Sequence, residues 1–291
     1  MIKTESLPTA FAAMAMDFYL PLADKVASWT KFSKGPLVVG INGAQGTGKS
    51  TLSKVLALAL KHHHHCRSAI LSIDDLYHTK SERRQLAKMV HPLLATRGVP
   101  GTHDVAMGRH LLDQLKNKQA VSLPVFDKAI DDRAPVDQWV SHPQAVDVIL
   151  FEGWCVGAVA QHESALARPV NHLEKDEDID ALWRKYANDQ LNVAYAGLFK
   201  RIDRLVMLKA PDFECVQEWR STQEDKLRLI TDPTRSNHAL MSQEQLERFI
   251  MHYERITRWM LEEMPERSDC VIELNTEHLV TKCRYNGNDK A

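Results

Sequence analysis

The stretch Pro36-Leu-Val-Val-Gly-Ile-Asn-Gly-Ala-Gln-Gly-Thr-Gly-Lys-Ser50 decides the fold. Its first part, Pro36 to Asn42, is a short apolar and β-branched run, which is typical of a buried parallel strand. The second part, Gly43 to Ser50, matches G-x-x-x-x-G-K-S/T in full. From Lys49 onward, apolar residues recur at helical spacing. The stretch therefore predicts a strand, a phosphate-binding loop and a helix, whose N-terminal dipole also favours phosphate.

Four more β-branched runs follow, at residues 69–73, 145–151, 204–208 and 270–274, with helical patterns between them. Alternation of short strands with helices predicts an α/β fold, with a five-stranded parallel sheet covered by helices on both faces. A late helix is expected to begin at Ser242, because Ser242 and Gln245 form a capping box ahead of an apolar stripe. Residues 1–35 are interpreted as a helical N-terminal extension packed on the core, and residues 36–291 as the phosphate-loop domain.

Composition excludes several classes of protein. The chain has 291 residues, of which 44% are hydrophobic and 26% charged, and Lys plus Arg number 37 against 38 Asp plus Glu. This balance predicts no nucleic-acid or membrane partner, because neither polyanion would be attracted by the chain as a whole. Five cysteines without a C-x-x-C pair argue against a disulfide framework or zinc site. No apolar run approaches the ~18 residues of a membrane span, so a cytoplasmic location is expected by elimination.

Two polar runs are interpreted as solvated. Glu174 to Asp180 holds five acidic residues ahead of a helical pattern, and a solvated helix N-terminus accounts for it. The four histidines from His62 to His65 end the helix that follows the phosphate loop. With no second cluster at ligand spacing, they are expected to be an exposed helix end rather than a metal site.

The loop and its neighbours supply candidate nucleotide-binding residues. Lys49 would reach the β- and γ-phosphates, and the Ser50 hydroxyl would ligate Mg²⁺. The candidate nucleotide-binding set is Gly43, Ala44, Gln45, Gly46, Thr47, Gly48, Lys49, Ser50 and Thr51. The N-K-x-D motif of GTPases is missing, because Asn117-Lys118 continues as Gln-Ala. The pattern therefore predicts a nucleotide site without deciding what happens to the γ-phosphate.

Carboxylates follow two of the predicted strands. Asp74 and Asp75 lie in Ser72-Ile-Asp-Asp-Leu-Tyr77, at the strand end where open α/β sheets bind ligands. Asp74 could accept a proton from a substrate hydroxyl or hold Mg²⁺. An Asp-Asp pair in a turn or at a helix N-cap is the alternative. Glu152 ends the third predicted strand and is a second candidate for Mg²⁺.

Five motifs together resemble the pantothenate kinase, uridine kinase and phosphoribulokinase superfamily, and within it the D-glycerate 3-kinase type. They are the phosphate loop, S-I-D-D-L-Y, R-G-V-P-G-T-H-D from Arg97 to Asp104, P-V-F-D-K from Pro124 to Lys128, and F-E-G-W at 151–154. The stretches L-E-K-D-E-D, W-R-K-Y-A-N and E-W-R-S-T-Q-E resemble that branch too, so the resemblance covers roughly residues 36–275. It implies a P-loop kinase fold with ATP and Mg²⁺ as cofactors and a small-molecule alcohol as acceptor. The oligomeric state stays open.

The resemblance also implies roles for individual residues. Asp74 corresponds to the catalytic aspartate, and Arg220 falls in the helical region that forms a lid over the phosphates. The catalytic set is thus Asp74, Lys49 and Arg220, and the metal set is Ser50, Asp74 and Glu152. Residues expected on the acceptor side are Asp75, Tyr77, Arg97, His103, Asp104, Lys128 and Arg133.

The acceptor is expected to be D-glycerate, giving 3-phosphoglycerate. A carboxylate-bearing acceptor should meet an arginine or lysine fork, and Arg97, Lys128 and Arg133 are the available cations. The segment Phe126-Asp127 stands where many relatives have Tyr-Asp, and residues 129–133 are less basic than an anionic acceptor would suggest. Alternatives are a kinase for pantothenate, a nucleoside or another sugar acid, and a regulatory protein that binds ATP as a switch.

Overall fold

The computed structural model describes residues 10–230 and 241–286 of the chain, and the side chains of residues 11–222 and 241–286. Within these ranges the β-strands are β1 Leu37–Gly43, β2 Ser68–Ser72, β3 Val121–Leu123, β4 Phe126–Asp127, β5 Asp132–Arg133, β6 Val140–His142, β7 Val148–Gly153, β8 Arg204–Lys209, β9 Cys270–Leu274 and β10 Val280–Tyr285. The α-helices are α1 Ala10–Met14, α2 Leu20–Thr30, α3 Lys49–His64, α4 Lys80–Met89, α5 Val105–Lys116, α6 His172–Glu177, α7 Leu182–Gln190, α8 Ala196–Phe199, α9 Phe213–Ile230 and α10 Gln243–Arg267.

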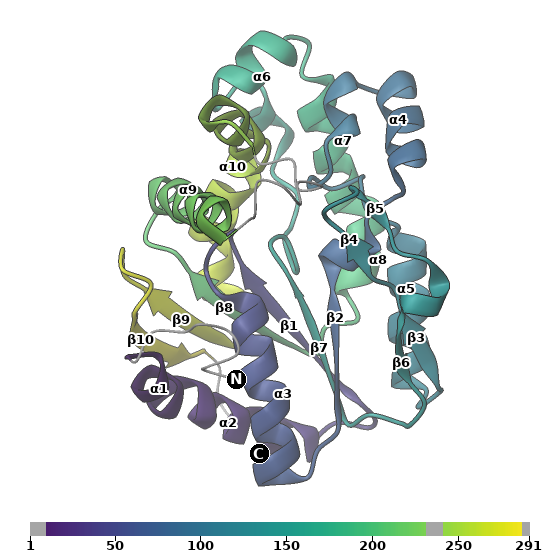
Figure 1. Cartoon of the computed structure of the whole chain (residues 1–291), viewed down its shortest axis with the longest axis vertical. Helices are drawn as coiled ribbons and strands as arrows, with labels where there is room; N and C mark the ends of the chain where they lie inside the picture. Colours follow the sequence, from purple (N-terminus) through teal and green to yellow (C-terminus); the bar gives the residue numbers. More distant parts are fainter. Residues whose placement is uncertain (1–9, 231–240, 287–291) are drawn as a thin grey trace.

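The central sheet has the strand order β10-β9-β8-β1-β7-β2, and β2, β7, β1, β8 and β9 run parallel (Figure 1). These are the five strands that the sequence predicts, so the expected fold class is confirmed. The sixth strand, β10, was not predicted, and it pairs antiparallel with β9 at the sheet edge. Its sequence Val-Thr-Lys-Cys-Arg-Tyr carries too little apolar character to stand out as a buried strand, as suits an edge position.

Helices cover both faces of the sheet. Alternate residues of β1 point to opposite faces, so Val39 packs in one apolar cluster with α2 and α3, and Val38 packs in another with α5 and α8. Helix α10 borders both clusters, with Ile250 in the first and Met260 in the second. It begins at the expected capping box, because the Ser242 and Gln245 side chains each bind the other's backbone N–H. The four histidines end α3, three of them exposed.

The N-terminal extension packs on the sheet over its described residues. Helix α2 places Leu22 and Val26 in the same apolar cluster as α3, both fully buried. Residues 1–9 of this segment lie outside the described residues. The division of the chain at residue 36 stays a prediction. Within the described residues, α2 is part of the same apolar cluster as α3 and the sheet.

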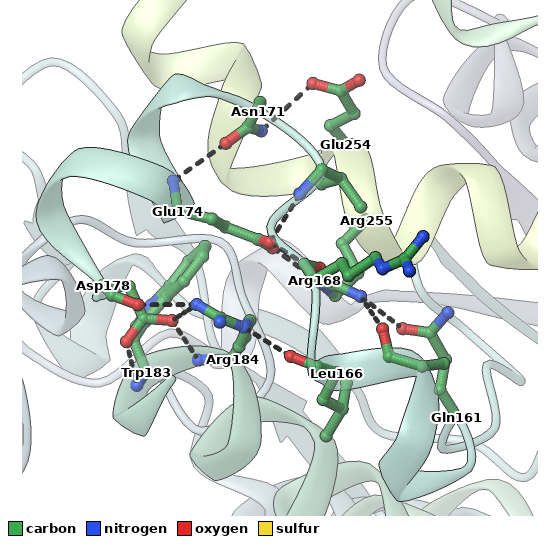
Figure 2. A network of polar contacts seen from close by, with 12 residues as sticks. Gln161, Leu166, Arg168, Asn171, Glu174, Asp178, Trp183, Arg184, Glu254 and Arg255 are labelled. Atoms are coloured by element: carbon green, nitrogen blue, oxygen red, sulfur yellow. Dashed lines mark hydrogen bonds and ion pairs between the residues drawn. The ribbon is translucent and has the colours of Figure 1, made fainter. Parts of the chain in front are cut away.

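The acidic run at 174–180 is only partly the solvated segment that the sequence suggested: Asp176, Glu177 and Asp180 are exposed, but Glu174 and Asp178 are buried. Glu174 binds Arg255 of α10 through both carboxylate oxygens at 2.7 and 2.6 Å, and both side chains are buried (Figure 2). Asp178 likewise pairs with buried Arg184 at 2.9 Å. Buried charges are stable only when they are paired and hydrogen-bonded, so the first pair holds α10 against α6 and the second holds the end of α6 against α7. The partners lie tens of residues away or in the next helix, which is why composition alone pointed the other way.

Candidate active site

The glycine-rich loop joins β1 directly to α3, as the sequence predicts. Gly46 and Gly48 have φ angles of 84° and 85°, a left-handed conformation that glycine adopts without strain. A Cβ atom at Gly46 would lie 2.9 Å from Cβ of Trp219, so any side chain there would collide with α9. The loop turns its backbone at the N-terminus of α3, where N–H groups and the helix dipole favour an anion.

A cavity of about 580 Å³ opens above this loop. It lies at the carboxyl ends of three adjacent strands, because residues following β1, β7 and β2 all contribute to its wall. Its lining residues are Gln45, Gly46, Gly48, Lys49, Ser50, Thr51, Asp74, Tyr77, Arg97, Lys128, Trp154, Trp219, Arg220, Thr222, Phe249, Tyr253 and His278. The structure thus brings the loop together with four residues predicted on the acceptor or catalytic side, Asp74, Tyr77, Arg97 and Lys128, and with Arg220 of α9. Of the predicted loop residues, Gly43, Ala44 and Thr47 are not part of this wall.

Asp74 sits in a short 3₁₀ turn after β2, with both carboxylate oxygens engaged. Oδ1 accepts a hydrogen bond from the Tyr77 hydroxyl at 3.0 Å, and Oδ2 accepts one from Nζ of Lys128 at 2.7 Å. Burial would raise the pKa of Asp74, but the charges of Lys128 and Lys49 outweigh it and hold that pKa well below its usual range. Asp74 is therefore an ionised carboxylate that faces the lysine of the phosphate loop. The Ser72 side chain caps this turn by accepting a hydrogen bond from the backbone N–H of Asp74. The N-cap role considered for the Asp-Asp pair therefore belongs to Ser72.

Asp75 is not among the residues that line the cavity. Its Oδ1 accepts a hydrogen bond from the backbone N–H of Phe126 at 3.0 Å, which fixes the start of the β4–β5 hairpin. Burial raises the pKa of Asp75 to about 6, and the negative charge of Asp74 adds to the effect, while the Phe126 N–H opposes it. The acceptor-side role expected for Asp75 stays a prediction, and in the structure the side chain anchors the hairpin next to Asp74.

Three other predicted acceptor-side residues also lie behind the cavity wall. His103 is buried, stacks on the Tyr77 ring at 4.4 Å, and bonds the Tyr195 hydroxyl through Nδ1 at 2.6 Å. Burial lowers the pKa of His103 to about 3, so its imidazole is neutral at physiological pH. Asp104 caps α5 by accepting from the N–H of Met107 at 2.9 Å. Arg133 donates to the carbonyl oxygen of Tyr77 at 2.9 Å. His103 and Arg133 therefore support Tyr77, and none of the three residues lines the cavity.

Ser50 and Glu152 meet below the loop. The Ser50 hydroxyl donates to Oε1 of Glu152 at 2.9 Å, and Oε2 of Glu152 is buried without a hydrogen-bond partner among the described residues. A hydroxyl and a carboxylate are hard oxygen ligands, the kind that Mg²⁺ takes from proteins, with phosphates and waters supplying the rest. An unpaired buried carboxylate oxygen fits such a cation. Among the described residues no group of three or more His, Cys, Asp or Glu forms a metal cage.

The cavity wall includes aromatic residues to which sequence reasoning gave no binding role. Trp219 donates from Nε1 to the carbonyl oxygen of Thr276 at 2.8 Å, and its ring lies 3.9 Å from that of His278 in the β9–β10 turn. Phe249 and Tyr253 come from α10, where the apolar stripe predicted only core packing. Trp154 also lines the cavity, and it is the last residue of the F-E-G-W motif at the end of the third predicted strand. The others become neighbours only through the folding of α9, α10 and the β9–β10 turn.

No helix in the described parts of the chain combines the length and apolar character of a membrane span.

No family profile matches the sequence. Individual proteins do match. An uncharacterized kinase of Schizosaccharomyces pombe is 33% identical over 231 residues, which are 75% of this chain and 78% of that protein. The chloroplastic D-glycerate 3-kinase of Arabidopsis thaliana is 29% identical over 255 residues, covering 81% of this chain but only 52% of that protein.

Solved structures agree on the fold. A D-glycerate 3-kinase from Cryptococcus neoformans superimposes with a TM-score of 0.72 at 23% identity, covering 91% of this chain and 99% of the other. At that identity the likeness establishes the fold alone. The relative at 33% identity, together with matches to pantothenate and uridine kinases, establishes the family. The chain belongs to the P-loop kinases of the pantothenate kinase, uridine kinase and phosphoribulokinase superfamily, and within it resembles the D-glycerate 3-kinase type.

Proposed function

We propose that the protein transfers the γ-phosphoryl group of ATP to a hydroxyl group of a small molecule, with D-glycerate as the leading acceptor and 3-phosphoglycerate as its product. One observation carries the proposal: the ionised Asp74 carboxylate and Lys49 of the phosphate loop line the same cavity, close enough for Lys49 to lower the pKa of Asp74. A kinase needs a carboxylate beside the γ-phosphate to orient the attacking hydroxyl, whereas a protein that only binds ATP does not.

The phosphates would lie on the glycine loop. The backbone N–H groups and Lys49 bind the phosphate oxygens, and Arg220 approaches the same cavity from α9. Ser50 and Glu152 would hold Mg²⁺, which supplies positive charge against the β- and γ-phosphates when bound. Most of the rate enhancement would come from positioning and from stabilising charge on the transferred group, as in other phosphoryl transfers.

The acceptor would enter beside Lys128. Tyr77 and Lys128 each donate to one oxygen of Asp74, so an acceptor hydroxyl would share one of these oxygens with them or displace Lys128 from Oδ2. The Lys128 side chain is 61% exposed, so it can move with little loss of packing. Helix α9 borders the cavity through Trp219 and Arg220, and closure of this side over the phosphates would exclude water and so prevent hydrolysis of ATP.

The test follows ADP release from the purified protein with Mg-ATP. D-glycerate is compared with pantothenate, uridine and other sugar acids, and the Asp74→Asn variant serves as the blank. Strong stimulation by D-glycerate, with 3-phosphoglycerate as product, supports the proposal in full. Stimulation by another acceptor keeps the kinase and discards glycerate. Tight ATP binding with no stimulation by any acceptor favours the regulatory protein. The cytoplasmic location and the absence of nucleic-acid and membrane partners stay predictions.

A further inference from the structure

The β4–β5 hairpin, residues 126–133, carries the acceptor side of the cavity. It is tied to the turn after β2 at three points along its length. The N–H of Phe126 bonds Asp75, Lys128 bonds Asp74, and Arg133 bonds the carbonyl oxygen of Tyr77. The hairpin therefore keeps a fixed position relative to Asp74. The hairpin also carries Asp131, whose carboxylate contacts Arg97.

Arg97 presents a guanidinium group to this end of the cavity. Its backbone is held by α10 and by the β7 turn, because its carbonyl oxygen accepts from the Tyr253 hydroxyl at 3.1 Å and the next carbonyl, of Gly98, accepts from Nε1 of Trp154 at 3.0 Å. The Arg97 guanidinium carbon lies 5.6 Å from the centre of the Phe126 ring, within range of a cation–π contact. The side chain keeps 23% of its surface exposed, and it lines the cavity.

Asp131 fixes the direction of this guanidinium. Its Oδ1 accepts from Nη1 of Arg97, and its Oδ2 accepts from Nη2 of Arg83 at 2.6 Å. Arg83 is fully buried and anchored by the carbonyl oxygens of His78 at 2.6 Å and of Asp131 itself at 3.0 Å. Asp131 has a φ angle of 56°, an uncommon left-handed conformation for a residue with a side chain. The buried Arg83 guanidinium thus fixes the position of the Asp131 carboxylate, and this carboxylate fixes the direction of the Arg97 guanidinium.

The charges of these residues do not cancel. Arg83, Arg97 and Asp131 together carry one net positive charge, whereas Lys128 is balanced by Asp74. Within the described residues, the hydrogen bonds recorded for the Arg97 side chain use only Nη1, although a guanidinium offers five N–H donors. Arg133, the third cation expected near the acceptor, does not line the cavity. Among these arginines Arg97 is the one that lines the cavity, so its remaining N–H donors are the ones that can reach a bound anion.

We infer that Arg97 binds an anionic group of the acceptor, and that Asp131 and Arg83 are positioning residues which aim its guanidinium, so that the site selects acceptor alcohols carrying a carboxylate over neutral ones. The inference rests on the proposed kinase function and narrows its acceptor. A carboxylate matches the planar fork of an arginine better than the point charge of a lysine. A neutral alcohol would leave the remaining N–H donors of Arg97 without an anionic partner and would not offset the one net positive charge that Arg83, Arg97 and Asp131 carry together.

The experiment compares kcat/KM for D-glycerate and for glycerol in the wild-type protein and in variants. Arg97→Gln is expected to lower the preference for D-glycerate by about 100-fold, and Arg97→Lys to restore part of it, because charge returns without the fork. Asp131→Asn keeps an oxygen toward Arg97 but removes the charge, and we expect it to raise KM for D-glycerate about 10-fold with a smaller change in kcat and none in KM for ATP. Asp132→Asn, next to it and bonded to the N–H of Lys80 instead, is the matched control.

A binding measurement tests this inference independently of the proposed kinase activity. Calorimetry with a non-hydrolysable ATP analogue measures D-glycerate and glycerol binding without turnover. If no acceptor is phosphorylated, the kinase proposal fails, yet D-glycerate binding that disappears in Arg97→Gln still supports the inference. A wild-type protein that uses or binds glycerol as well as D-glycerate overturns it. So does an unchanged preference in Arg97→Gln, and equal effects of Asp131→Asn and Asp132→Asn remove Asp131 from the positioning role.

Discussion

The hydroxyl of Ser50 donates a hydrogen bond to Oε1 of Glu152 at 2.9 Å, linking the first residues of α3 to the end of β7. These two residues are 102 positions apart in the chain, and only the parallel pairing of β1 with β7 brings them together. Oε2 of Glu152 is buried with no partner among the described residues. Such an atom costs free energy unless a cation or water meets it, and this supports the proposal that the pair holds Mg²⁺.

Replacement of Glu152 by glutamine tests this arrangement. Glutamine keeps an oxygen toward Ser50 and fills the same volume, but it removes the negative charge. We expect the Mg²⁺ concentration that gives half-maximal ADP release to rise about 10-fold or more. Loss of a metal ligand, or of a group that orients one, typically weakens metal binding by this amount. A titration of Mg²⁺ at fixed ATP measures it. An unchanged Mg²⁺ requirement would mean that Glu152 serves only to hold α3.

Asp74→Asn separates binding from transfer. The amide retains a hydrogen bond to Tyr77 but cannot accept a proton, and it no longer pairs with Lys128. The loss of a positioned base lowers kcat by about 10²- to 10⁴-fold. Binding of a fluorescent ATP analogue should stay within a few-fold of wild type, because the phosphate loop is untouched. A variant with near-normal turnover would take Asp74 out of the base role.

Much of this site follows from the sequence because its parts stand at strand ends. The phosphate loop, Asp74 and Glu152 each follow a run whose apolar character marks a parallel strand, and parallel strands end at one edge. Tertiary partners are what the sequence does not contain. Glu174 is predicted to be solvated, but α10 places Arg255 against it. Nothing in the sequence around Asp131 indicates that it will pair with Arg97 and Arg83. Strand β10 was likewise not predicted, because an edge strand with few apolar residues gives little hydrophobic signal in the sequence.

The stability of the protein should depend on pH through Asp75. Its pKa is raised from 3.8 to about 6 in the folded state, so the stabilisation it contributes is complete below pH 3.8 and is lost as pH rises through 6. This gap corresponds to about 3 kcal/mol. Asparagine keeps the oxygen that accepts the Phe126 N–H and cannot ionise. We expect the unfolding free energy of Asp75→Asn to match that of wild type near pH 4 and to exceed it increasingly from pH 5 to 8.

Urea denaturation at pH 4, 5, 6, 7 and 8 provides the measurement. The difference between Asp75→Asn and wild type is compared across pH, so that effects common to both proteins cancel. A constant difference would show that Asp75 does not ionise between these values, and the stabilising contribution assigned to its burial would then be wrong.

The buried pair of Glu174 and Arg255 links α10 to α6, and we expect it to contribute to the free energy of unfolding. Arg255→Met leaves the Glu174 carboxylate, which is 1% exposed, without its bidentate partner. An uncompensated buried charge costs about 3 to 5 kcal/mol of unfolding free energy. Arg248 on the same helix makes an equally short contact with Glu177, at 2.6 Å, but both side chains are more than 40% exposed. Arg248→Met should therefore cost less than about 1 kcal/mol.

Urea unfolding of both variants at pH 7 compares the two pairs directly. Adding Glu174→Gln to Arg255→Met removes the stranded charge, so the double variant should recover part of the stability that the single variant lost. Equal losses in Arg255→Met and Arg248→Met would show that burial does not distinguish the pairs. Because Phe249 and Tyr253 of α10 line the cavity, Arg255→Met should also raise KM for ATP or the acceptor at temperatures where the protein is still folded, whereas Arg248→Met should leave both unchanged.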